Sequence, residues 1–109
     1  MRLLILVCAL LGRASLAATA TVAAYCPCAR CCGVAGRPAA NGRPPVAGVT
    51  IAGPRALPFG TRVWIEGIGL RIITDRSALR FDDRFDLFVP DHETAKRFGL
   101  KQLRVTILK

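Results

Sequence analysis

The sequence predicts a mainly β protein, a small six-stranded β-barrel with one short helix. Short apolar runs rich in β-branched residues alternate with glycine and proline turns, a pattern typical of small barrels. A single convincing helix pattern lies near the C-terminal end. The length of 109 residues allows one domain with a modest core.

Six strands are expected, and two of them should form a hairpin. Val63 and Ile65 alternate with Arg62 and Trp64, which predicts a strand over residues 61–66. The tight Gly67-Ile68-Gly69 connection joins it to a second strand over residues 70–74. The other strands are expected at residues 21–25, 49–52, 85–89 and 103–108, and residues 26–48 form a long irregular stretch.

The expected helix follows Asp91, which can accept a hydrogen bond from the first turn as an N-cap. Glu93 lies in the first turn and Arg97 in the last, and both charges suit the helix dipole. Gly99 ends the segment. His92, the one histidine, is interpreted as a hydrogen-bonding residue at the helix start rather than as a ligand or base.

The N-terminal residues 1–18 are predicted to be a secretory signal peptide, which leaves residues 19–109 as the domain. Arg2 precedes a short apolar run over residues 3–11, and small residues over 15–20 offer a cleavage site. An uncleaved anchor or a buried helix is the alternative. We therefore expect an exported monomer in the periplasm, at the outer membrane or in the medium.

The charge is strongly basic and uneven. The net charge is +9, residues 19–65 contain no acid, and all seven acids lie between Glu66 and Glu93. A basic face suits an anionic polymer or envelope surface, although it also simply keeps a small protein soluble. Expected export argues against a nucleic-acid partner.

Four of the seven acids gather in one segment, between two runs predicted to be strands. These are Asp75, Asp82, Asp83 and Asp86. Carboxylates at strand ends beside a polar loop are suited to general acid–base chemistry. In an extended segment Arg84 and Asp86 share one face. Burial would favour the protonated form of Asp86, whereas the charge of Arg84 would favour its carboxylate form.

Four cysteines lie within seven residues, at Cys26, Cys28, Cys31 and Cys32. Thiolates suit zinc, but zinc sites usually take ligands from separate chain segments, and export favours oxidation. Two disulfides are therefore predicted, paired either 26–31 with 28–32 or 26–32 with 28–31, because a bridge between adjacent cysteines is strained. No metal ion and no cofactor are expected.

Several segments together resemble the "3D" (three-Asp) domain. The run from Ala24 to Gly33 resembles the family's opening, and residues 57–69 resemble its Pro-Leu-Gly-Thr-x-Val-x-Ile-x-Gly-x-Gly segment. Asp75 and Asp86 keep the family spacing. The resemblance spans nearly all of residues 23–109 and implies a double-psi β-barrel, shared with the catalytic domain of membrane-bound lytic transglycosylase A.

The resemblance implies a peptidoglycan glycan strand as substrate. Asp86 lies where that enzyme group has its general acid/base, and Asp75 where it has a supporting Asp. A single carboxyl group suffices for lytic cleavage, because the sugar's own C6 hydroxyl attacks the anomeric carbon. We assign substrate contact to Arg84, Asp82 and Asp83. For the last two the favoured interpretation is a solvated loop acid, although either could substitute for a lost family residue.

Two departures from the family pattern leave other functions open. Residues 77–82 replace the family's Gly-Gly-Ala-Ile-Lys-Gly segment, and Gly53 stands where the first Asp belongs. The alternatives are a noncatalytic, expansin-like barrel that binds the cell wall, and a basic protein that binds any anionic surface. Asp75 and Asp86 would then only stabilise loops through nearby arginines.

Overall fold

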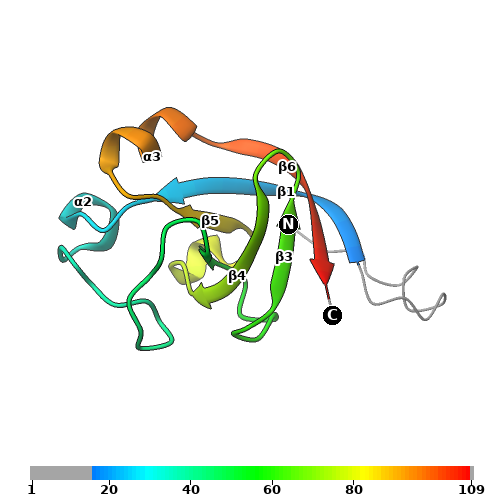
Figure 1. The fold of residues 1–109 in the computed structure, drawn as a ribbon, viewed down its shortest axis with the longest axis horizontal. Coiled ribbons are helices and arrows are strands. Elements are labelled where there is room, and N and C mark those ends of the chain that lie inside the picture. Colours follow the sequence, from blue (N-terminus) through cyan, green and yellow to red (C-terminus); the bar gives the residue numbers. More distant parts are fainter. Residues whose placement is uncertain (1–15, 109) are drawn as a thin grey trace.

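The computed structural model describes residues 16–108 as a closed barrel of six strands (Figure 1). The strands run in the order β1-β5-β2-β4-β3-β6 around the barrel. Their bounds are β1 Leu16–Tyr25, β2 Thr50–Ala52, β3 Arg62–Ile65, β4 Gly69–Asp75, β5 Phe85–Phe88 and β6 Lys101–Leu108. The predicted six-stranded β-barrel is confirmed.

The barrel mixes parallel and antiparallel pairs. β1 lies parallel to β5 and β2 lies parallel to β4, whereas the remaining four neighbouring pairs are antiparallel. This mixed closed sheet fits the double-psi barrel that the family resemblance implied. β3 and β4 form the predicted hairpin, with Arg62 opposite Ile72 and Ile65 opposite Gly69.

The core fills the interior of the barrel with branched and aromatic side chains. Every strand of the barrel contributes at least one buried residue. The largest fully buried apolar side chains are Phe85, Ile51, Ile65, Ile73, Val22, Val63 and Val105. Phe85, Leu87 and Val89 all belong to this core cluster, as the alternation in that segment predicted.

The predicted helix is α3 (His92–Phe98), and it begins and ends as the capping residues indicate. Asp91 Oδ1 accepts a 2.8 Å hydrogen bond from the Thr94 N–H, and Gly99 follows with φ 69°. Two shorter segments were not predicted: α2 (Ala29–Cys32) and the 3₁₀ helix η1 (Leu79–Phe81). Each is a single turn, which is too short to produce a helical periodicity.

β1 is longer than the sequence predicted. It begins at Leu16 and pairs with β6 from Leu16 opposite Ile107 to Val22 opposite Lys101. Most of the predicted signal peptide, residues 1–15, lies outside the described residues, and residues 16–18 form the start of β1. Within residues 16–108, no helix has the length and apolar character needed to cross a membrane.

The cysteines do not form the predicted disulfides in this structure. Cys26, Cys28, Cys31 and Cys32 are all free. The first three sulfur atoms converge on Nδ1 of His92 instead of facing one another as two separate pairs. Sequence spacing gave no indication of this partner, because His92 lies about sixty residues further along the chain.

Gly53 follows β2 at a point where the backbone lies against the core. A Cβ atom at this position would lie 2.6 Å from Cδ1 and 3.0 Å from Cγ1 of Ile73. Ile73 is fully buried on β4. The first Asp of the family pattern could not occupy position 53 unless Ile73 moved, so the glycine and the isoleucine form a matched pair.

We expect Gly53→Ala to lower the free energy of unfolding by roughly 1–3 kcal/mol, because the new methyl group overpacks Ile73. Ile73→Val alone should cost about 0.5–1.5 kcal/mol. In urea unfolding, the double variant should lose less than the sum of the single changes, because Val lacks the clashing δ-methyl group. Strictly additive losses would contradict this close contact.

Candidate functional site

The strand register places Asp75 and Asp86 in one row across the barrel wall. Ala52 on β2 lies between them, opposite Asp75 of β4 on one side and opposite Asp86 of β5 on the other. Ala23 of β1 lies on the far side of Asp86. The register shifts between Ile51 and Ala52, so that Thr74 is skipped and Asp75 comes opposite Ala52. Both aspartates line the same groove, and their backbones are two strand spacings, about 10 Å, apart.

A groove of about 790 Å³ covers this row. Its walls combine the two aspartates with five arginines, Arg37, Arg55, Arg76, Arg80 and Arg84. Small side chains form part of its surface, among them Ala24 and Ala52. The lining of the groove therefore combines a cluster of cationic side chains with two acidic ones.

Asp75 is held by three donors at the end of β4. The Tyr25 hydroxyl donates to Oδ2 at 2.5 Å, and the main-chain N–H groups of Ala40 and Arg76 each donate to Oδ1 at 2.8 Å. Burial, followed by this hydrogen bond and the charge of Asp75, raises the pKa of Tyr25 well above its ordinary value. Tyr25 therefore remains a hydrogen-bond donor, and the orientation of the Asp75 carboxylate is fixed.

Asp86 is more deeply buried and has different partners. Its side chain forms an ion pair with Arg84, with 2.9 Å between Nε and Oδ1, and it accepts a hydrogen bond from the Ser77 hydroxyl on Oδ2. Desolvation by burial raises the pKa of Asp86. The Ser77 hydrogen bond and the Arg84 charge oppose this shift, and the nearby Asp75 adds to it.

The two carboxyl groups thus have different environments. Asp86 has a raised pKa and reaches the groove, which are the properties of a group that carries a proton to a substrate. Asp75 accepts three hydrogen bonds, which suits a fixed charge that orients its surroundings. Two carboxyl groups with different environments in one groove are a common arrangement in sites for acid–base chemistry.

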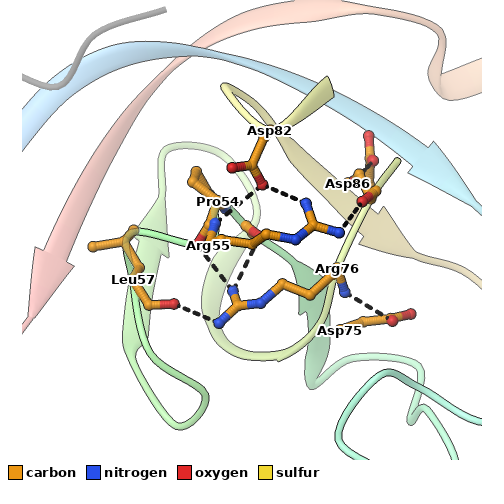
Figure 2. A network of polar contacts seen from close by, with 9 residues as sticks. Pro54, Arg55, Leu57, Asp75, Arg76, Asp82 and Asp86 are labelled. Carbon is orange, nitrogen blue, oxygen red and sulfur yellow. Dashed lines mark hydrogen bonds and ion pairs between the residues drawn. The ribbon is translucent and has the colours of Figure 1, made fainter. Parts of the chain in front are cut away.

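Two arginines hold the loops around the groove (Figure 2). The Arg76 guanidinium donates to the carbonyl oxygens of Gly53, Pro54 and Leu57, at 3.1, 2.9 and 2.8 Å. Arg55 donates to Asp82 at 2.7 Å and to the Ser77 carbonyl at 3.1 Å. Arg76 therefore fixes the segment in which the family's first Asp would lie.

The residues predicted to contact substrate are not all in the groove. Arg84 lines it and lies 3.8 Å from the centre of the Phe81 ring. Asp82 is paired with Arg55. Neither Asp82 nor Asp83 is among the residues that form the groove walls in the described part of the chain.

Sequence reasoning missed Tyr25 and Ser77 as partners of the aspartates. Tyr25 is the only tyrosine and stands directly before the first cysteine, inside the segment that resembles the family opening. Ser77 lies two residues after Asp75, in the segment that departs from the family. A hydroxyl group two residues from a predicted catalytic Asp could have indicated Ser77 as a hydrogen-bond partner in the site.

No family model matches the chain. Two proteins of Bacillus subtilis are similar in sequence over 64 residues, or 59% of this chain. One is the "Putative cell wall shaping protein YabE", at 33% identity and covering 16% of that protein. The other is the "Cell wall-binding protein YocH", at 31% identity and covering 22%. The chain therefore spans less than a quarter of either relative.

Among solved structures, the barrel is similar to MltA from Escherichia coli, described as having a unique lytic transglycosylase fold. Two crystal structures of MltA each match with a TM-score of 0.56, at 22% and 20% identity. Each match covers 69% of this chain and 28% of MltA. This likeness confirms the predicted fold relationship to that enzyme.

We expect Asp86 to titrate above the ordinary pKa of about 3.9 for aspartate in a ¹³C NMR titration of the side-chain carboxyls. Ser77→Ala should raise this pKa further, because it removes a hydrogen bond that stabilises the carboxylate. A raised folded-state pKa means that Asp86 favours folding at low pH, and that this contribution is lost as the pH rises through that value.

Asp91 is an internal reference for the same titration. Hydrogen bonds from Thr94 lower the pKa of Asp91, so its signal should move at a lower pH than the Asp86 signal. An Asp86 signal that moves together with or below that of Asp91 would contradict the buried environment described above.

Proposed function

We propose that this protein cleaves the glycan strands of peptidoglycan by the lytic transglycosylase reaction, with Asp86 as the general acid and base. The observation that carries the proposal is a buried carboxyl with a raised pKa that lines a groove of about 790 Å³ together with Asp75. The fold shared with MltA and the two cell-wall relatives support the same substrate class.

The reaction requires one carboxyl group that works twice. Protonated Asp86 donates its proton to the glycosidic oxygen as the bond to the anomeric carbon breaks. The C6 hydroxyl of the same muramyl sugar attacks that carbon and closes a 1,6-anhydro ring. The Asp86 carboxylate then accepts the hydroxyl proton, which restores the starting state without an activated water.

In this scheme Ser77 and Arg84 act on the pKa of Asp86 in the opposite direction to burial. Both stabilise the carboxylate form of Asp86, which is the product of the first proton transfer. Burial keeps the protonated form available before that step. Asp75 holds its place through Tyr25 and can stabilise the positive charge that develops on the sugar ring.

The arginines around the groove provide a second reason for a cell-wall substrate. Peptidoglycan carries carboxylates on the peptides attached to its glycan strands, and a cationic groove attracts such a polyanion. Arg80 and Arg37 are exposed at the groove walls and available for this contact. We propose an envelope location on the same grounds.

A second candidate function is binding of the cell wall without cleavage. The Arg84 ion pair favours a permanently charged Asp86, which could not donate a proton. The relative named as a cell wall-binding protein supports this alternative. The two functions share the groove and differ only in the protonation of Asp86 in the bound state.

We expect wild-type protein incubated with purified peptidoglycan to release 1,6-anhydromuramyl products, detected by mass spectrometry. Asp86→Asn should reduce the rate by at least about 100-fold, because the amide cannot transfer the proton. Asp83→Asn is the matched control, since it removes an acid from the neighbouring loop but not from the groove.

The amount of protein that sediments with insoluble peptidoglycan separates the outcomes. Products from wild type and not from Asp86→Asn, with equal sedimentation, support the lytic reaction. Sedimentation of both without products would support wall binding alone. Equal products from both variants would remove Asp86 from the proposal.

We expect Arg80→Glu to weaken sedimentation with peptidoglycan several-fold at low salt, because it reverses a charge on the groove wall. Arg97→Glu is the control, an equal charge reversal at an exposed position on α3, outside the groove. Equal weakening by both variants would indicate attraction to the whole basic surface instead of the groove.

A further inference from the structure

Three cysteines and the histidine come together between α2 and the start of α3, and one of them, Cys31, also lines the groove. Cys26 follows β1, Cys28 is the N-cap of α2, Cys31 lies within α2, and His92 begins α3. The three Sγ atoms and one ring nitrogen of His92 all lie within 4.8 Å of one another. Two chain segments far apart in sequence thus meet through side chains that commonly bind metal ions.

The four donor atoms are close enough together to surround a single ion. Cys26 Sγ lies 3.0 Å from Cys28 Sγ and 3.5 Å from Cys31 Sγ. Nδ1 of His92 lies 3.8, 3.3 and 3.5 Å from the sulfurs of Cys26, Cys28 and Cys31. A zinc ion with its usual bond lengths has tetrahedral edges of about 3.8 Å between sulfurs and about 3.6 Å between sulfur and nitrogen.

Disulfide formation does not account for this arrangement. A disulfide joins two sulfurs, whereas three sulfurs here face the same histidine nitrogen. Cys32 is the cysteine left out of the cluster, and its thiol donates instead to the Cys26 carbonyl at 3.2 Å. Because Cys32 has a different partner, the remaining donors are three cysteines and one histidine, a Cys₃His set.

We propose that Cys26, Cys28, Cys31 and His92 bind one zinc ion in a closed structural site. Three thiolates and one imidazole are donors that zinc prefers, and four protein ligands leave no position for a substrate or a reactive water. One ion fits better than a metal cluster, because every donor atom lies so close to every other. Binding through Nδ1 requires that Nε2 carries the proton.

The site would anchor the wall of the groove. Residues 33–49 contain no helix or strand, and Arg37, Ala39 and Ala40 from this stretch line the groove. The ion would tie the start of this stretch to α3, while the contact between Ala40 and Asp75 holds it further along. Zinc binding would therefore contribute folding energy to a loop with few internal contacts.

The test is the zinc content of the full chain, purified under reducing conditions and measured by plasma mass spectrometry beside protein concentration. We expect one zinc per chain in the wild type. Cys31→Ser and His92→Asn should each lose most of it, and Cys32→Ser should retain it. Cys32→Ser is a close match for Cys31→Ser, because the two positions are adjacent in α2.

Cobalt binding and chelator sensitivity can both be measured on the wild-type protein itself. Cobalt added to metal-free wild type should give the absorption bands of a tetrahedral thiolate complex. His92→Cys should retain one metal with an altered cobalt spectrum, because it replaces one ligand by another. A chelator should lower the melting temperature of wild type and Cys32→Ser.

The proposal would be overturned if reduced wild type bound no zinc or cobalt, if Cys32→Ser lost metal as fully as Cys31→Ser, or if disulfides formed among Cys26, Cys28 and Cys31 when zinc was present. The measurement involves no glycan, and Asp86→Asn should bind zinc like the wild type. Failure of the zinc site and failure of the lytic function are therefore separate results.

Discussion

Closure of the barrel through two parallel pairs is the constraint on which the site depends. β2 lies between β4 and β5 in the barrel, so two strands that follow one another in the sequence are separated in the sheet and come to flank one residue, Ala52. A side chain larger than alanine at this position would project between the two carboxyls. The same register that closes the core therefore also sets the spacing of Asp75 and Asp86.

The electrostatics of the groove follow from burying one acid in a basic protein. Desolvation raises the pKa of Asp86, whereas the Ser77 hydrogen bond and the Arg84 charge lower it. An ion pair this well buried is rarely a large net source of stability, because the cost of desolvation offsets most of the attraction. The physical value of such a pair here is that it fixes where the carboxyl lies and how readily it gives up its proton.

The long loop before β2 shows how a small domain can order a segment that adds almost nothing to the core. Asp75 accepts a hydrogen bond from the main-chain N–H of Ala40 in this loop. The Cys₃His cluster supplies a second attachment at the start of the loop. Each attachment replaces the apolar burial that a chain of this size cannot provide.

The sequence by itself determined the barrel, the hairpin and α3, because alternation, turn glycines and the Asp91 cap act over a few neighbouring residues. It also pointed to Asp75 and Asp86 through their spacing. The period-two alternation of an extended segment also placed Arg84 beside Asp86. Only the tertiary structure decided the partners from outside that segment, because Tyr25 and Ser77 take part through strand register and loop packing. His92 meets the cysteines for the same reason, since contacts between distant segments exist only after the barrel has closed.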